Sequence, residues 1–176
     1  MKSSILILFL MLLIGLFFSS TSHAESDENI TQEKIAHIRE HCVENQASLN
    51  RLRQADAFLR TDRGNLYRTI SDKLMVPLNQ RLASNSLDGG NLIGLAADFT
   101  EEYDRFYGAY VDYASSLTEL LSIDCSRQPV TFYSTLLKTR AYRQQVAESN
   151  QKLKSLIRQY GEEFVRFKTA YSKANQ

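Results

Sequence analysis

The chain has 176 residues, with 21 Lys or Arg against 20 Asp or Glu, so its formal net charge at pH 7 is only +1. A charge so close to neutral argues against a nucleic-acid-binding protein, which needs a basic face, and against strong attraction to anionic lipid. Only seven Gly and two Pro occur, and this scarcity of helix-breaking residues favours long helices.

The N-terminal segment has the layout of a secretory signal peptide. Residues 5–18 are all apolar or glycine, Lys2 precedes them, and Ser22 and Ala24 form a small-x-small cleavage site. The apolar run is shorter than the roughly 20 residues that a membrane span needs, and no second long apolar run follows. We therefore predict a signal peptide over residues 1–24.

Cleavage would leave one domain over residues 25–176, secreted or otherwise extracytoplasmic at the cell envelope. If the signal is not cleaved, the same segment would act as an N-terminal membrane anchor. Within residues 25–176 we expect no transmembrane span. Of the charged residues only Lys2 is lost with the signal, so the mature chain has 20 basic (21 − 1) and 20 acidic residues and is neutral.

The first helical segment is predicted over residues 31–83, where apolar residues recur at steps of three and four. This stripe consists of Ile35, Ile38, Cys42, Leu49, Leu52, Leu59, Leu66, Ile70, Leu74, Leu78 and Leu82. Asn45, Asp56 and Arg63 interrupt it where a strict coiled-coil heptad would have apolar residues. Pro77 predicts a kink, because its ring clashes with the carbonyl of the preceding turn.

Two further helical segments follow, each after a short turn. Residues 84–91 form a turn around a Gly-Gly pair, and an almost unbroken apolar stripe then predicts a helix over residues 92–122. Pro129 is well placed to begin the next helix, which we expect to run to residue 174. The middle of that helix, residues 140–150, is polar.

Short turns between long helices imply that consecutive helices are antiparallel neighbours. We therefore predict an all-α fold, an elongated antiparallel three-helix bundle with a kinked first helix. The alternative is a four-helix bundle in which the first segment breaks near Gly64.

Cys42 and Cys125 are the only two cysteines, and an even number in an exported chain suggests a disulfide. Cys42 lies near the start of the first segment and Cys125 lies in the turn after the second. An antiparallel arrangement brings these two places to the same end of the bundle. We predict a bridge that closes a loop of about 80 residues.

His37 and His41 are the only histidines of the mature chain, and they stand one helical turn apart. This spacing can present two imidazoles to one metal ion. No third protein ligand is identifiable, so we interpret the pair as two solvated side chains and predict no metal site.

The sequence has few of the patterns that enzymes use. It contains no Gly-rich phosphate loop and no Glu-x-x-His pair, and straight helices seldom build the pocket that a Ser-His-Asp set needs. We interpret the tyrosines between residues 103 and 113 as core and boundary packing. The arginines between residues 51 and 68 are offset by aspartates and are interpreted as a solvated surface. We predict no catalytic residues, no cofactor and no enzymatic activity.

Two stretches carry a resemblance to a known group of proteins. One is Asp-Ala-Phe-Leu-Arg-Thr-Asp-Arg-Gly-Asn-Leu-Tyr at residues 56–67, continued by Ile-Ser-Asp-Lys-Leu at 70–74 and by Pro77; the other is Ile-Asp-Cys at 123–125, followed by Pro-Val-Thr-Phe-Tyr at 129–133. Together the two stretches resemble uncharacterised exported α-helical proteins of candidate phyla radiation bacteria such as Saccharibacteria. The resemblance covers nearly the whole mature chain. The resemblance implies a bacterial, extracytoplasmic setting and carries no activity with it.

The sequence thus predicts an exported, non-enzymatic helical bundle that acts by contact with a protein partner at the cell envelope or outside the cell. Long helices with a polar middle offer extended faces and few pockets. The alternative is an extracytoplasmic helical module that binds a small ligand or a metal between its helices. The partner and the oligomeric state are not specified by these patterns.

Overall fold

A computed structural model describes residues 30–174, apart from the side chain of Leu59, and this part of the chain is helical without strands. The predicted signal peptide, residues 1–24, lies outside the described residues. The elements are α2 (Gln32–Glu40), α3 (Cys42–Thr69), the π-helical segment η2 (Ile70–Met75), α4 (Val76–Ser84), α5 (Leu92–Ser122) and α6 (Pro129–Ala174). None of these helices is long and apolar enough to cross a membrane.

The first predicted segment is a succession of helices. Helix α2 begins at Thr31, whose Oγ1 accepts a hydrogen bond from the Lys34 N–H at 3.2 Å, and it ends at His41. Helix α3 begins at the next residue and passes through Gly64 without interruption. The chain is therefore interrupted at His41 and not near Gly64.

Pro77 changes the helical hydrogen bonding of the segment that precedes it. Proline has no N–H to donate, so a regular ladder of hydrogen bonds cannot continue through it. The chain forms the wider turns of η2 immediately before this point, where the Val76 N–H donates to the Ser71 carbonyl five residues back. Pro77 itself lies in the first turn of α4, where a missing N–H costs little.

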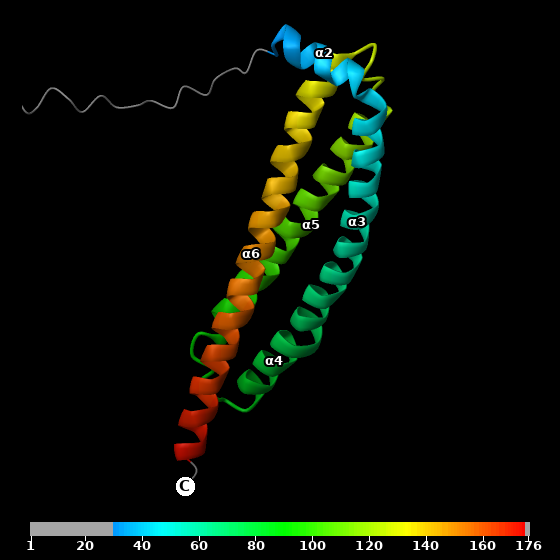
Figure 1. The fold of residues 1–176 in the computed structure, drawn as a ribbon. Helices are drawn as coiled ribbons and strands as arrows, with labels where there is room; N and C mark the ends of the chain where they lie inside the picture. The colour runs from blue at the N-terminus through cyan, green and yellow to red at the C-terminus, as the bar shows by residue number, and fades with distance from the viewer. Residues whose placement is uncertain (1–29, 175–176) are drawn as a thin grey trace, which may run out of the picture. The chain divides into compact units, whose positions relative to one another are not determined.

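The bounds of α5 and α6 agree with the predicted segments 92–122 and 129–174. These two helices run side by side, α3 packs on α5, and α2 lies against the first turns of α6 (Figure 1). The main core lies where the end of α3, η2 and α4 meet the other two helices. It consists of Tyr67, Met75, Leu82, Leu92, Ala96, Phe99, Phe106, Leu153, Leu156 and Tyr160.

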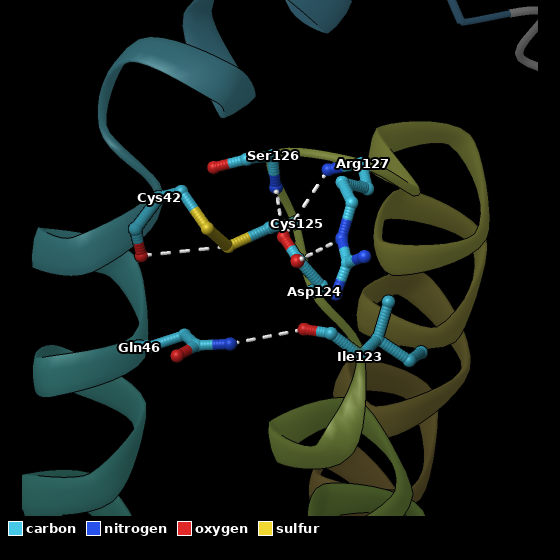
Figure 2. A network of polar contacts seen from close by, with 7 residues as sticks. All are labelled: Cys42, Gln46, Ile123, Asp124, Cys125, Ser126 and Arg127. Atoms are coloured by element: carbon cyan, nitrogen blue, oxygen red, sulfur yellow. Dashed lines mark hydrogen bonds and ion pairs between the residues drawn. A yellow bond between two sulfur atoms is a disulfide. The ribbon is translucent and has the colours of Figure 1, made fainter.

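The predicted cysteine pair lies at the start of α3 and in the turn between α5 and α6, at the opposite end of these helices from this core. The sulfur atoms of Cys42 and Cys125 are bonded and the Cα atoms are 5.4 Å apart, so the antiparallel arrangement does bring the two residues together (Figure 2). One turn further along α3, Gln46 Nε2 donates to the carbonyl oxygen of Ile123 at 2.9 Å. Both contacts attach α3 to the turn between α5 and α6.

That turn is held in shape by Asp124. Its Oδ1 accepts hydrogen bonds from the backbone N–H groups of Ser126 and Arg127, and Arg127 Nε donates to its Oδ2 at 2.6 Å (Figure 2). The side-chain bond from Arg127, followed by the backbone bonds, lowers the pKa of Asp124 below its ordinary value. An ionised Asp124 therefore organises the approach to α6.

Candidate functional site: a cleft between three helices

A cleft of about 250 Å³ opens between α3, α5 and α6 and borders the core at Phe106. Its lining consists of Asp56, Arg60 and Arg63 from α3; Phe106, Tyr110 and Tyr113 from α5; and Arg143, Val146, Ala147 and Asn150 from α6. The polar middle of α6 explains its position, because α6 buries no side chain between Thr139 and Leu153. Long polar side chains bridge α3 and α6 at this level.

The first bridge centres on the carboxylate of Asp56. Asp56 Oδ2 accepts hydrogen bonds from Tyr113 Oη at 2.6 Å and from Arg143 Nε at 3.0 Å, so one carboxylate joins all three helices. The Asp56 side chain is only 12% exposed, whereas that of Arg143 is 52% exposed. A carboxylate this far out of water needs a charged partner, and Arg143 supplies it.

The same contacts fix the protonation states in this bridge. Burial raises the pKa of Tyr113, and its hydrogen bond to Asp56 raises it further. The hydrogen bond to Asp56 also raises the pKa of Arg143. Tyr113 is therefore a neutral donor and Arg143 a cation over the whole physiological range, and the charge of Asp56 is fully engaged.

The other two arginines have no such carboxylate. The Arg60 guanidinium lies 4.9 Å from the centre of the Tyr110 ring, a cation–π distance. Arg63 lies beside Tyr67, whose pKa is raised by burial and lowered to a smaller extent by this arginine. Within residues 30–174, neither guanidinium forms an ion pair with a carboxylate. The lining of the cleft therefore holds three arginines and one aspartate.

The second bridge lies toward the core. Tyr67 Oη donates to Asn150 Oδ1 at 2.5 Å, and the Tyr67 ring contacts Phe106 edge-on, with 5.6 Å between the ring centres. Phe106 and Val146 give this side of the cleft an apolar wall. The lining thus offers guanidinium groups, an amide and aromatic faces, which are groups that bind and orient a small molecule.

The predicted histidine pair lies elsewhere, at the junction of α2 and α3. The rings of His37 and His41 are 4.5 Å apart between centres, and His41 Nδ1 lies 3.0 Å from Glu44 Oε2. No cluster of three or more His, Cys, Asp or Glu side chains placed to hold a metal occurs among the described residues.

Sequence reasoning missed the cleft, although a signal for it was present. Asp56 and Arg63 were recognised as polar interruptions of the first stripe, and residues 140–150 as a polar stretch. Both α3 and α6 run away from the disulfide end. Asp56 follows the start of α3 by 14 residues (56 − 42), and Arg143 follows the start of α6 by 14 residues (143 − 129). Because the rise per residue is the same in both helices, Asp56 and Arg143 lie at the same distance from the disulfide end.

Comparison of the chain with known proteins finds no matching family model, no similar curated protein and no similar solved structure. The function of the cleft is therefore argued from its geometry.

Proposed function

We propose that the protein is an exported, non-enzymatic helical module that holds a small organic molecule in the cleft between α3, α5 and α6. One observation carries the proposal: α6 buries no side chain between Thr139 and Leu153, and the space is lined by polar groups that converge from three helices. Protein interiors are otherwise packed nearly without voids. A volume of about 250 Å³ is slightly below the roughly 300–1,000 Å³ that is usual for ligand pockets, so the ligand is small.

Two observations support the extracytoplasmic setting. Residues 1–24 have the pattern of a secretory signal, and Cys42 and Cys125 lie at disulfide distance. Disulfides persist in oxidising compartments. Within this proposal the bundle has three long helical arms, and the first arm is kinked where η2 precedes Pro77.

A second candidate function, contact with a protein partner, is favoured by apolar side chains exposed near the end of α6. Val165 is 60% exposed and Phe164 38% exposed. An amphipathic helix end of this kind can dock on another protein. Native mass spectrometry of the protein isolated from its own host separates the candidates, because a ligand-binding module should carry a small adduct and a contact module a second polypeptide.

The proposed function is tested with a library of small acids, bases and neutral compounds by ligand-observed NMR. The matched variant is Ala147→Trp, which fills the cleft from an exposed position of α6. We expect at least one compound to bind the unmodified protein and to lose binding in Ala147→Trp. The proposal is wrong if no compound binds, or if every bound compound binds the filled variant equally well.

A further inference from the structure

We infer that the ligand of the cleft is a small organic anion, whose carboxylate or phosphate is bound by Arg60 and Arg63 and whose apolar part packs on the aromatic wall. The inference rests on the proposed ligand-binding function and specifies the charge and shape of the ligand. The inference follows from the charges of the cleft, because some of them are already neutralised by a partner and others are not.

The charges of the cleft divide into a neutralised pair and an unneutralised pair. Asp56 is bound to Arg143 and Tyr113 at 3.0 and 2.6 Å, so its charge is not free to attract a cation. Arg60 and Arg63 remain without a carboxylate partner in residues 30–174. A ligand that enters the cleft therefore meets two net positive charges, which favours an anion.

The spacing of Arg60 and Arg63 strengthens this conclusion. Residues three apart on a helix lie on the same face, with about 5–6 Å between their Cβ atoms, and like charges there repel each other. Arg63 is half-buried, so its charge is also partly removed from water. An anion placed between the two guanidinium groups would relieve the repulsion and replace the lost hydration.

The chemistry of guanidinium selects among anions. Its planar fork of N–H donors matches carboxylate and phosphate oxygens and can bind them in a bidentate way. Stacking on the Tyr110 ring holds the Arg60 guanidinium in place, which reduces the side-chain entropy lost on binding. Because Asn150 Oδ1 accepts the Tyr67 hydroxyl, its Nδ2 remains as a further donor at the cleft.

The remaining lining determines what the anion is attached to. Phe106 and Tyr110 are buried and Val146 is half-buried, and their ring and aliphatic carbons form the apolar part of the lining beside the two arginines. Inorganic phosphate would leave this surface exposed to water, whereas benzoate or phenyl phosphate would cover it. Burial of apolar surface contributes roughly 25 cal/mol per Å², so the organic anion should bind more tightly than the free anion.

The test is isothermal titration calorimetry of the exported protein at low salt with five probes: benzoate, phenyl phosphate, inorganic phosphate, benzylamine and benzyl alcohol. The variants are Arg60→Gln, Arg63→Gln and the double variant, with Arg53→Gln as the matched control, since Arg53 is exposed on the same helix and does not line the cleft. Circular dichroism checks that each variant keeps the helical fold. Each cleft variant should weaken binding of benzoate and phenyl phosphate by about ten- to a hundredfold, while Arg53→Gln stays within about twofold.

The outcomes separate the inference from the proposed function. If benzylamine or benzyl alcohol binds as tightly as benzoate, the cleft binds ligands but does not select anions, and the inference is wrong while the function stands. If inorganic phosphate binds as tightly as phenyl phosphate, the aromatic wall does not contribute to binding. The inference that the ligand is an organic anion is then wrong. If no probe binds, the inference is wrong, and the compound library decides the proposed function separately.

Discussion

Helix α6 contacts α5 and α3 in different ways. Toward α5 it makes most of its contacts, and the buried polar contact there is direct, with the hydroxyls of Ser116 and Thr139 2.8 Å apart. Toward α3 it is reached by long side chains, through Asp56 with Arg143 and Tyr67 with Asn150. The first interface stabilises the fold. The second joins α3 to α6 through side chains and leaves the cleft open between them.

The largest effect is expected in the packed core. Leu153 is fully buried among residues of α3, α4 and α5, so Leu153→Ala removes contacts and leaves a cavity. The free energy of unfolding should fall by about 2–5 kcal/mol, measured by urea denaturation. The neighbouring exposed Lys154→Ala is the control, with a change within about 0.5 kcal/mol. Equal losses in both variants would contradict the placement of the core.

Loss of the Cys42–Cys125 bridge should have the next largest effect. The two residues are 83 positions apart, and removing a disulfide of this kind costs about 2–4 kcal/mol. At this chain length, each kcal/mol should lower the melting temperature by roughly 2–5 °C. Thermal unfolding with and without reductant, beside Cys42→Ser, measures this. Free thiols in the oxidised native protein, or identical melting curves, would contradict the bridge.

The polar interface should respond to loss of the Asp56 charge. Asp56→Asn leaves Arg143 without its ion-pair partner among two other arginines, and Tyr113 then donates to a neutral acceptor. We expect the free energy of unfolding to fall by about 1–3 kcal/mol at low ionic strength, measured by urea denaturation. Asp62→Asn, at an exposed position six residues (62 − 56) further along α3, should be nearly neutral. Equal stability of the Asp56 variant and the unmodified protein would show that the bridge does not hold α3 to α6.

The helices were predictable because their signal is local. The apolar stripes predicted residues 92–122 and 129–174 to within the observed bounds, since steps of three and four define one face of a helix without reference to the rest of the chain. The interruption at His41 was not predicted, because α2 and α3 continue the same periodicity across it.

The cleft was harder to predict because its contacts are non-local. Asp56 and Arg143 are 87 positions apart, and Tyr67 and Asn150 are 83 apart. A sequence shows each polar residue but not its partner. Arg60 and Arg63 were therefore interpreted as solvated surface, whereas their position opposite the polar middle of α6 makes them part of the cleft.

The buried phenol group of Tyr113 is expected to have the smallest effect on stability at neutral pH. This effect should grow as the pH becomes alkaline. Burial raises the pKa of Tyr113 above the ordinary value of 10.0, so the folded protein keeps this proton when the unfolded chain has lost it. Stability from this group is complete below pH 10 and falls as the pH rises further. Urea midpoints between about pH 9 and 11 should fall less steeply in Tyr113→Phe. Tyr107→Phe, at a position that is 52% exposed, is the matched control, and a slope in Tyr113→Phe equal to that of the unmodified protein would contradict the burial of Tyr113.

A crystal structure of the exported protein grown with phenyl phosphate tests the central claim most directly, namely that the polar α3–α6 interface is a binding site. The account predicts the phosphate between the Arg60 and Arg63 guanidinium groups and the phenyl ring on the wall formed by Phe106 and Tyr110. A cleft closed by direct packing of α3 on α6, or phenyl phosphate bound only at other places on the protein, would contradict it.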